Sequence, residues 1–506
     1  MANEYVNIKT PNLDKNVPTK ETFETVFPSP NEKILAVSDW DANTKLATIT
    51  VEGVLADEDK QLITVVPKFE NREDYINAGI YCYRQAENQL SFKCEVIPTS
   101  DLYIYVILEN VVYTSPTPPT PTIKIYGAEW TNNTESPVWT RTDDAVGFAD
   151  PQPAVAGGTG SSPFDNIMPW SGMVRHTDDT AGEMVAIPKF YYKITREYGG
   201  KPNATIKIQI SDQQFDGSHV SPAHMDRGDG KGERNIVYVG RYHCHREPAS
   251  YYKSVTNVLP TASQPYVTMI ADHSKSKGIY CFDYATLVTI QMLYLVEFAN
   301  WNSQAMIGYG GTEDGTISQT GSTDTMQYHT GTMQASRTTY GTGIQYRYIE
   351  DLWANLITVI GNTYITLGDT NDKNKLFISL NLNNYNTSDN GFATNATLVT
   401  NDLRNTNELN TIIALDQSTV DNFDWVLYGS LGTLLDYDAD NLIPVYTCDK
   451  NIIYNSSNST STKQIVVTGG SDAVGGQKYG LFYFQNATID NIDSYNYYGC
   501  RNVLLP

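Results

Sequence analysis

The densest group of side chains that could hold a metal lies between positions 219 and 245. It consists of four histidines, one cysteine and one aspartate: His219, His224, His243, His245, Cys244 and Asp226. On a strand, His243 and His245 would point both imidazoles to one face, which suits a zinc or iron pair. A closed site needs further ligands, and the spacing of His219 and His224 fits no common template. We therefore expect surface histidines on a hairpin and its preceding loop, with no resident metal.

Three acidic residues, Asp226, Asp229 and Glu233, lie close together in the segment HMDRGDGKGER. Their spacing lacks the alternating acidic positions and the terminal glutamate of an EF-hand loop. The same stretch contains Arg227-Gly228-Asp229, a three-residue match that chance readily supplies in a flexible turn. We expect a solvated turn here rather than a calcium site.

The chain offers few signatures of catalysis. It has no GxSxG motif, no Walker loop and no GxGxxG motif between a strand and a helix. Six cysteines are spread thinly without CxxC spacing, at Cys82, Cys94, Cys244, Cys281, Cys448 and Cys500. This favours neither a disulfide framework nor a zinc site, and we expect Cys500 to be a small buried hydrophobe. A pair of glycan-hydrolysing carboxylates stays open as an alternative, but we expect no enzymatic activity and no cofactor.

Composition restricts the classes of protein that fit. The 506 residues carry a formal net charge of −22, which argues against nucleic-acid binding. Tyrosine is unusually frequent, with 35 Tyr against 15 Phe, and its apolar ring with a polar tip suits half-wet surfaces. The longest apolar stretch, Tyr284–Phe298, is shorter than the ~20 residues that a bilayer requires. Without a secretory signal at the N-terminus, we expect synthesis in a reducing cytosol and no membrane insertion.

The clearest domain boundary is the Pro/Thr segment TSPTPPTPT at 114–122, which predicts an extended linker. Upstream, residues 1–113 contain short runs with the period of half-buried strands. These are Leu46–Val54, Leu62–Val66, Tyr75–Tyr83, Leu90–Val96 and Leu102–Leu108. They predict a small, immunoglobulin-like β-sandwich.

Downstream, residues 123–506 predict one large domain that is mostly β with a few helices (α+β). Strand-like pieces are Glu183–Ile194, Ala204–Ile210 and Asn235–Tyr242. Helices are expected at Tyr284–Phe298 and Tyr348–Ile360, a long loop at Gly308–Thr342, and an Asn/Thr-rich insertion at about 362–461. Trp139, Trp170 and Trp353 are expected in the core.

Several segments of this second domain, taken in order, resemble one group of proteins. They are Val138–Phe148 with Ser161–Arg175, Glu183–Ile194, Leu295–Gln304, Tyr346–Ile360 and the closing Val466–Pro506. The series resembles bacteriophage tail and fibre proteins with a C-type-lectin-like domain, similar to formylglycine-generating enzymes and retroelement-diversified proteins. In those proteins Glu183–Ile194 would form a strand hairpin. Ala354 stands where the group has Gly, and Thr358 where it commonly has an acidic or polar residue.

The resemblance implies a virion fibre or tail protein, released from the host by lysis. Residues 1–113 would attach to a virion protein, and the lectin-like domain would bind a receptor on the bacterial surface as a homotrimer. The charge of −22 favours a protein or neutral glycan receptor. A head-fibre or capsid decoration protein that binds mucus or host glycans is the first alternative. A polysaccharide-degrading or formylglycine-generating-type enzyme is the second, although Cys448 and Cys500 lie in no matching motif. No clear equivalent of the Glu-Pro-Asn triplet of calcium-dependent lectins occurs, so such sugar binding is not supported.

The polar and aromatic loop near the C-terminus is where we expect the receptor to bind. Every residue of 486–498 is of a type that an Asn codon reaches by adenine changes alone, as a diversity-generating retroelement would produce. Rigid aromatic faces with short polar groups are typical of binding surfaces. The expected contacts are Tyr483, Gln485, Asn486, Asp490, Asn491, Asp493, Tyr495, Asn496 and Tyr497, with loop residues of Gly308–Thr342 sharing the surface.

Overall fold

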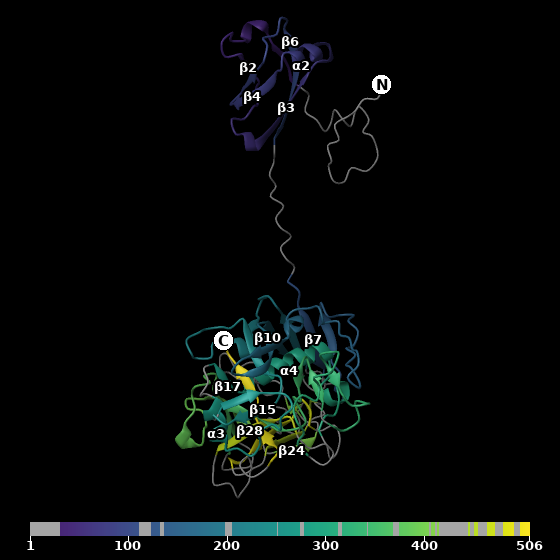
Figure 1. Ribbon diagram of the computed structural model, residues 1–506, viewed down its shortest axis with the longest axis vertical. Coiled ribbons are helices and arrows are strands. Elements are labelled where there is room, and N and C mark those ends of the chain that lie inside the picture. The colour runs from purple at the N-terminus through teal and green to yellow at the C-terminus, as the bar shows by residue number, and fades with distance from the viewer. Residues whose placement is uncertain are drawn as a thin grey trace. The chain divides into compact units, whose positions relative to one another are not determined.

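The computed structural model divides the chain into two compact units, Met1–Thr122 and Ile123–Pro506, and the boundary coincides with the end of the Pro/Thr segment (Figure 1). The residues that the structure describes are 31–110, 123–131, 136–197, 205–249, 251–273, 278–311, 316–341, 343–367, 374–403, 406–409, 412–413, 444–445, 450–453, 463–470, 479–489 and 496–506. The described part is mostly β with a few helices, as the sequence predicts. None of its helices is both long enough and apolar enough to cross a bilayer.

The first unit contains two three-stranded antiparallel sheets that share one core. Their strand orders are β1–β6–β3 and β2–β5–β4. The bounds are β1 Asn31–Leu35, β2 Leu46–Thr50, β3 Gln61–Pro67, β4 Tyr81–Ala86, β5 Gln89–Lys93 and β6 Leu102–Asn110. Alternate residues of facing strands, such as Leu90 and Phe92 on β5 and Ile104 and Val106 on β6, are buried together.

One predicted strand of this unit is wrong. Within Tyr75–Tyr83, the first residues belong to helix α2 (Arg72–Asn77), and only the end belongs to β4. Glu73 and Asp74 occupy the first turn of α2, where negative charge favours a helix, and Gly79 follows its end with φ +61°. These start and stop signals outweigh the β propensity of the aromatic residues.

The second unit is built on three larger sheets. The first is seven-stranded, in the order β15–β16–β10–β14–β31–β17 with β9 beside β10. Its bounds are β9 Arg175–Asp178, β10 Gly182–Pro188, β14 Ile236–Gly240, β15 Cys244–Glu247, β16 Tyr251–Ser254, β17 Ile279–Cys281 and β31 Asn502–Leu504. The C-terminal strand β31 thus lies between β14 and β17, inside the sheet (Figure 1).

The second sheet is five-stranded, in the order β13–β11–β12–β7–β8. Its bounds are β7 Tyr126–Thr131, β8 Thr140–Asp143, β11 Tyr191–Glu197, β12 Thr205–Ser211 and β13 His219–Val220. The hairpin expected at Glu183–Ile194 is wrong, because β10 and β11 belong to different sheets. Pro188 ends β10, since proline has no N–H to continue the ladder, and the chain then crosses to the second sheet.

The third sheet is eight-stranded, in the order β23–β22–β21–β28–β29–β27–β24 with β30 beside β21. Its bounds are β21 Ile357–Thr366, β22 Asn374–Ile378, β23 Thr397–Leu403, β24 Thr406–Leu409, β27 Lys450–Ile453, β28 Lys463–Thr468, β29 Phe484–Ala487 and β30 Tyr498–Gly499. The described strands of 362–461 therefore extend a sheet that also contains the terminal segment. Two smaller sheets belong to the same unit. One is three-stranded, of β18 Gly331–Thr332, β19 Ile344–Tyr346 and β20 Ile349–Glu350, and the other is two-stranded, of β25 Ile412–Ile413 and β26 Pro444–Val445.

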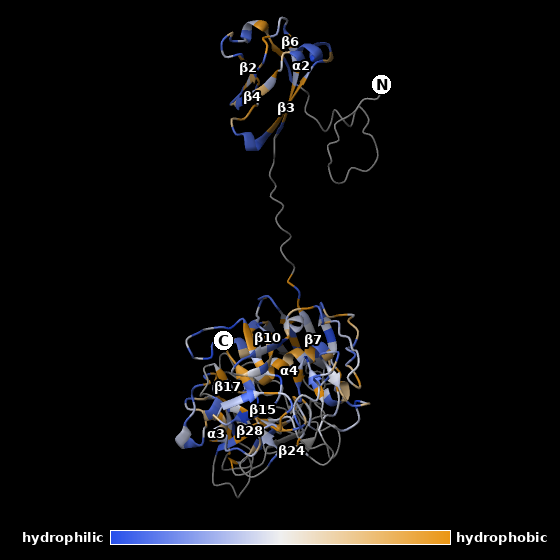
Figure 2. Cartoon of the chain, in the orientation of Figure 1, coloured by the Kyte–Doolittle hydropathy of each residue, from blue (hydrophilic) through white to orange (hydrophobic). Residues whose placement is uncertain are grey.

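Helix α4 (Tyr284–Phe298) forms the centre of the second unit, at the residues that the sequence predicts. All of its residues are buried, as expected of a helix that is apolar on every side, and hydrophobic colours gather on it in Figure 2. Asp283 caps its N-terminus by accepting a hydrogen bond from the Thr286 N–H. The shorter helices are α3 (Tyr266–His273) and α5 (Ser303–Met306). Trp139, Trp170 and Trp353 are buried around this core, which confirms that expectation.

The helix expected at Tyr348–Ile360 is wrong. The segment contains β20, an irregular turn and the start of β21, and left-handed φ values at Asp351, Ala354 and Asn355 prevent a helix. Ala354, at φ +82°, occupies the position where the resembling proteins have glycine, which adopts such a φ without strain. The long loop expected at Gly308–Thr342 is confirmed, since its described part contains no strand longer than β18.

Candidate functional site

A buried carboxylate near the end of α4 joins segments that are distant in the sequence. Glu297 accepts hydrogen bonds from the Ser162 hydroxyl at 2.7 Å and the Tyr346 hydroxyl at 3.0 Å. Arg347 donates to it twice, from Nη2 at 2.6 Å and Nε at 2.9 Å. Burial alone would lower the pKa of Arg347, but the charge and hydrogen bonds of Glu297 raise it above its ordinary value. The charged pair and the two hydroxyl contacts therefore hold the segments around Ser162 and Tyr346 against the C-terminal end of α4.

Arg347 also lines a cavity of about 180 Å³. The lining residues come from the segment after Ser161, from the long loop and from the turn between β19 and β20: Asp165, Trp170, Ser171, Met173, Val174, Tyr328, His329, Arg347 and Tyr348. The side chains of Asp165 and His329 remain 27% and 12% exposed, so solvent reaches the cavity. We call this set of residues the Asp165 pocket.

Asp165 is the acceptor around which the pocket is organised. It receives hydrogen bonds from the Tyr328 hydroxyl at 2.8 Å, His329 Nε2 at 2.9 Å and Arg347 Nη2 at 3.3 Å. Burial raises the pKa of Asp165, but the hydrogen bonds from His329 and Tyr328 outweigh this effect and lower it. Asp165 is consequently an anion at neutral pH.

The other side of the pocket is aromatic. The Tyr328 and His329 rings lie 4.0 Å apart, and the Tyr348 ring lies 5.5 Å from His329 in an edge-on arrangement. The guanidinium of Arg175, an exposed residue at the start of β9, lies 5.1 Å from the centre of the Tyr348 ring. A flat ring beside fixed polar groups is the composition of many small-molecule sites.

The hydrogen bonding of the pocket favours binding over proton transfer. Both oxygens of Asp165 already accept hydrogen bonds, including one from the Ser162 N–H at 3.0 Å. Both nitrogens of His329 are also engaged, Nε2 with Asp165 and Nδ1 with the Thr330 hydroxyl at 2.8 Å. A general base must be able to reach a substrate proton, and these groups are held by partners within the protein.

Of the terminal-segment residues expected to contact a receptor, none that the structure describes lines this pocket, whereas the loop Gly308–Thr342, expected to share the surface, contributes Tyr328 and His329 to it. Tyr483 and Asn486 are 2% and 3% exposed, because they lie at or within β29, an interior strand of the eight-stranded sheet. Gln485 and Tyr497 are half-buried, and Asn496 is exposed. Asp490, Asn491, Asp493 and Tyr495 lie outside the described residues. The described candidates with accessible side chains are therefore Gln485, Asn496 and Tyr497.

The histidines singled out as metal candidates do not converge, and two of them are not on the surface. His224 is fully buried, with Nδ1 2.7 Å from the Ser221 hydroxyl and Nε2 2.8 Å from the Ile187 carbonyl oxygen. His243 is also buried and lies 3.0 Å from the Thr358 hydroxyl. Only His219 and His245 reach the surface. The expectation of surface histidines is thus wrong for His224 and His243, which satisfy buried polar groups.

The acidic turn is organised by arginines. Asp229 pairs with Arg234, and Arg227 is buried against Asp283, the cap of α4. The expectation of a solvated turn is therefore wrong for Arg227, whose side chain belongs to the core.

Reasoning from the sequence missed Asp165, His329 and Arg347. Asp165 and Arg347 do lie in segments that carry the resemblance, and His329 lies in the long loop, but they are up to 182 residues apart. A comparison with protein-family models finds none that matches, and a search of curated proteins finds no match.

Proposed function

We propose that this chain is a bacteriophage fibre or tail protein that binds a receptor on the host surface without chemical turnover. The observation that carries the proposal is the Asp165 pocket: an open cavity with an aromatic side and fixed hydrogen-bonding groups, in the unit that follows the Pro/Thr segment. Most of its lining residues lie in Ser161–Arg175 and Tyr346–Ile360, two of the segments that resemble the lectin-like domains of such proteins, and Tyr328 and His329 come from the long loop.

The charges of the pocket indicate the class of receptor. Asp165 and Glu297 are balanced by Arg347 and the rim residue Arg175, so the site has no excess of either sign. A neutral ligand with several hydroxyl groups can stack on Tyr348 beside the charge-balanced polar groups of the pocket. A neutral surface glycan is the receptor that this chemistry fits best.

The first unit supports the other half of the proposal, attachment to the virion. Outward-facing residues of β3 include Leu62 at 55% and Val66 at 43% exposure, and in the segment that follows, Phe69 and Ile76 are 89% and 64% exposed. Large apolar side chains exposed to this degree are typical of interaction surfaces when they gather on one face. A virion protein is the partner that we propose for this surface.

Adsorption of the purified full chain to host cells tests the receptor site. Tyr348→Ala should weaken binding about tenfold or more, as truncation of an aromatic contact typically does. The matched control is Tyr251→Ala, which truncates a half-buried tyrosine of β16 that does not line the pocket. Equal binding by the two variants would contradict the pocket as the site.

The terminal segment is tested in the same assay. Loss of adsorption in the double variant Tyr495→Ala/Tyr497→Ala, with Tyr348→Ala binding normally, would move the site to that segment. Release of sugar fragments from host polysaccharide by the wild-type protein would contradict a non-catalytic role.

A further inference from the structure

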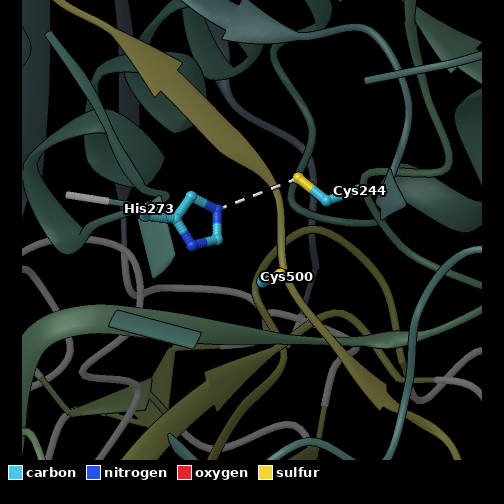
Figure 3. Close-up of side chains that lie close together, drawn as sticks. All are labelled: Cys244, His273 and Cys500. Atoms are coloured by element: carbon cyan, nitrogen blue, oxygen red, sulfur yellow. Dashed lines mark hydrogen bonds between the residues drawn. The ribbon is translucent and has the colours of Figure 1, made fainter. Parts of the chain in front are cut away.

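Three potential metal ligands meet in the interior of the second unit. Cys244, His273 and Cys500 are all buried, and their ligand atoms lie within 4.8 Å of one another (Figure 3). They come from the start of β15, the end of α3 and the turn between β30 and β31. The cluster lies apart from the Asp165 pocket, with which it shares no residue.

The imidazole of His273 is oriented as a metal ligand would be. Its Nδ1 lies 2.6 Å from the Met269 carbonyl oxygen, and because a carbonyl only accepts, Nδ1 carries the proton. In the neutral imidazole this tautomer leaves Nε2 as the free lone-pair donor, and Nε2 faces the Cys244 sulfur at 3.9 Å (Figure 3). The ring is held in place by stacking on Tyr252 at 4.5 Å. Histidine ligands typically donate their second ring N–H to a backbone carbonyl in this way.

The two cysteines are held next to each other by the backbone. The Cys244 N–H donates to the Cys500 carbonyl oxygen at 2.9 Å. The Cys244 thiol donates a hydrogen bond to the amide oxygen of Asn502 at 3.0 Å, while the amide nitrogen of Asn502 donates to the carbonyls of Ala181 and Tyr252. These two bonds fix the direction of the Asn502 oxygen, so a fourth potential ligand atom faces the cluster.

The distances and charges suit zinc. Zn–S bonds of about 2.3 Å and Zn–N bonds of about 2.0 Å place the ligand atoms of a tetrahedral site roughly 3.5–3.8 Å apart. The His273 Nε2 and the Cys244 sulfur are 3.9 Å apart, and all three ligand atoms lie within 4.8 Å of one another. Two thiolates and a neutral imidazole around Zn²⁺ have no net charge, which a fully buried site requires. On binding, both thiols release their protons to solvent and each sulfur forms a bond to the metal.

We propose that Cys244, His273 and Cys500 form a structural zinc site, with the Asn502 oxygen facing the fourth position. Zinc there would join β15, α3 and the C-terminal segment, which are far apart in the sequence. The neighbouring Arg501 already anchors that segment by donating to the carbonyls of Gly240 and Glu350, each at 2.7 Å. The metal would add a second anchor directly before the C-terminal strand β31.

The test uses the full chain purified under reducing conditions and reconstituted with ZnCl₂ or CoCl₂. We expect one zinc per chain by elemental analysis, a higher Tm with zinc than with a chelator, and a sulfur-to-cobalt charge-transfer band for the Co²⁺ form. Cys244→Ser and His273→Gln should each lower zinc content at least tenfold. The control Cys281→Ala removes another buried cysteine of this unit and should retain one zinc.

Circular dichroism shows whether a variant that has lost zinc is still folded. The Co²⁺ spectrum of His273→Gln gives a second check, because this variant keeps both thiols. Binding of zinc by Cys244→Ser as tight as by the wild type would overturn the proposal. So would a Cys244–Cys500 disulfide in the freshly purified wild-type protein, or occupancy by copper alone.

Discussion

At the scale of single residues, His224 couples the stability of the second unit to pH. Burial lowers the pKa of His224 to about 4, and the charges of Arg227 and Lys189 act in the same direction against the hydrogen bond to Ile187. In the unfolded chain, the pKa returns to about 6.5. As the pH falls from 6.5 towards 4, His224 is protonated in the unfolded chain but stays neutral in the folded one. The free energy of unfolding therefore decreases in that pH range. Between pH 7.5 and pH 5 the loss due to His224 should be ~2 kcal/mol.

Urea denaturation across this pH range measures the effect. His224→Gln can still donate to the Ile187 carbonyl but cannot titrate, so its stability should fall less steeply than that of the wild type. His243, whose pKa burial also lowers, supplies a remaining slope. His219→Gln, at an exposed position, should keep the wild-type slope. Identical slopes for His224→Gln and the wild type would show that His224 is not the coupled group.

At the scale of elements, α4 depends on its N-cap residue, Asp283, for two functions. One oxygen of Asp283 accepts from the Thr286 N–H at 3.2 Å and its hydroxyl at 2.6 Å, and the other pairs with Arg227. Asp283→Asn keeps an oxygen for the cap but leaves the buried Arg227 unpaired, which should cost ~3 kcal/mol. Asp283→Ala also removes the cap and should cost about 1 kcal/mol more. Chemical denaturation of both variants measures the two contributions.

A matched control for the Asp283 variants is Asp144→Asn. Asp144 also accepts from a backbone N–H, that of Ile125, and pairs with Lys124, but this ion pair is solvent-exposed. Solvent screens such pairs, so the unfolding transition should remain almost unchanged. Equal destabilisation by Asp144→Asn and Asp283→Asn would contradict the importance of burial.

The elements also show where a sequence-based prediction succeeds. Tyr284–Phe298 is identifiable because a 15-residue apolar run without breakers exceeds the length of an ordinary strand. Tyr348–Ile360 is apolar too, but β21 is buried on both faces, and such a strand lacks the alternation that separates it from a helix. Of the left-handed residues that divide this run, Ala354 is not of a type that indicates a turn, whereas Asp351 and Asn355 are turn formers that the apolar pattern around them outweighs.

At the scale of the whole molecule, both candidate sites arise from tertiary contacts that no local spacing reveals. Asp165 and His329 are 164 residues apart, and Cys244 and Asn502 are 258 apart. In the sequence, the pattern His243-x-His245 suggests that the two histidines could share a metal. In the fold, it is Cys244, the residue between them, that lies beside other potential ligands, His273 and Cys500. Motifs predict sites when the ligands share one element, and these sites are divided among several.

Assembly is the property of the whole molecule that our proposed function makes testable. A fibre protein that binds a glycan weakly at each site gains avidity when several copies bind together. The resemblance to phage fibres implies a homotrimer, and the exposed Leu62 and Phe69 of the first unit are apolar surface that our proposal assigns to assembly. Light scattering after size exclusion should give three times the chain mass of 56.4 kDa at micromolar concentration. A monomer under these conditions would contradict the trimer, and adsorption that is equally strong for monomer and trimer would contradict the role of avidity.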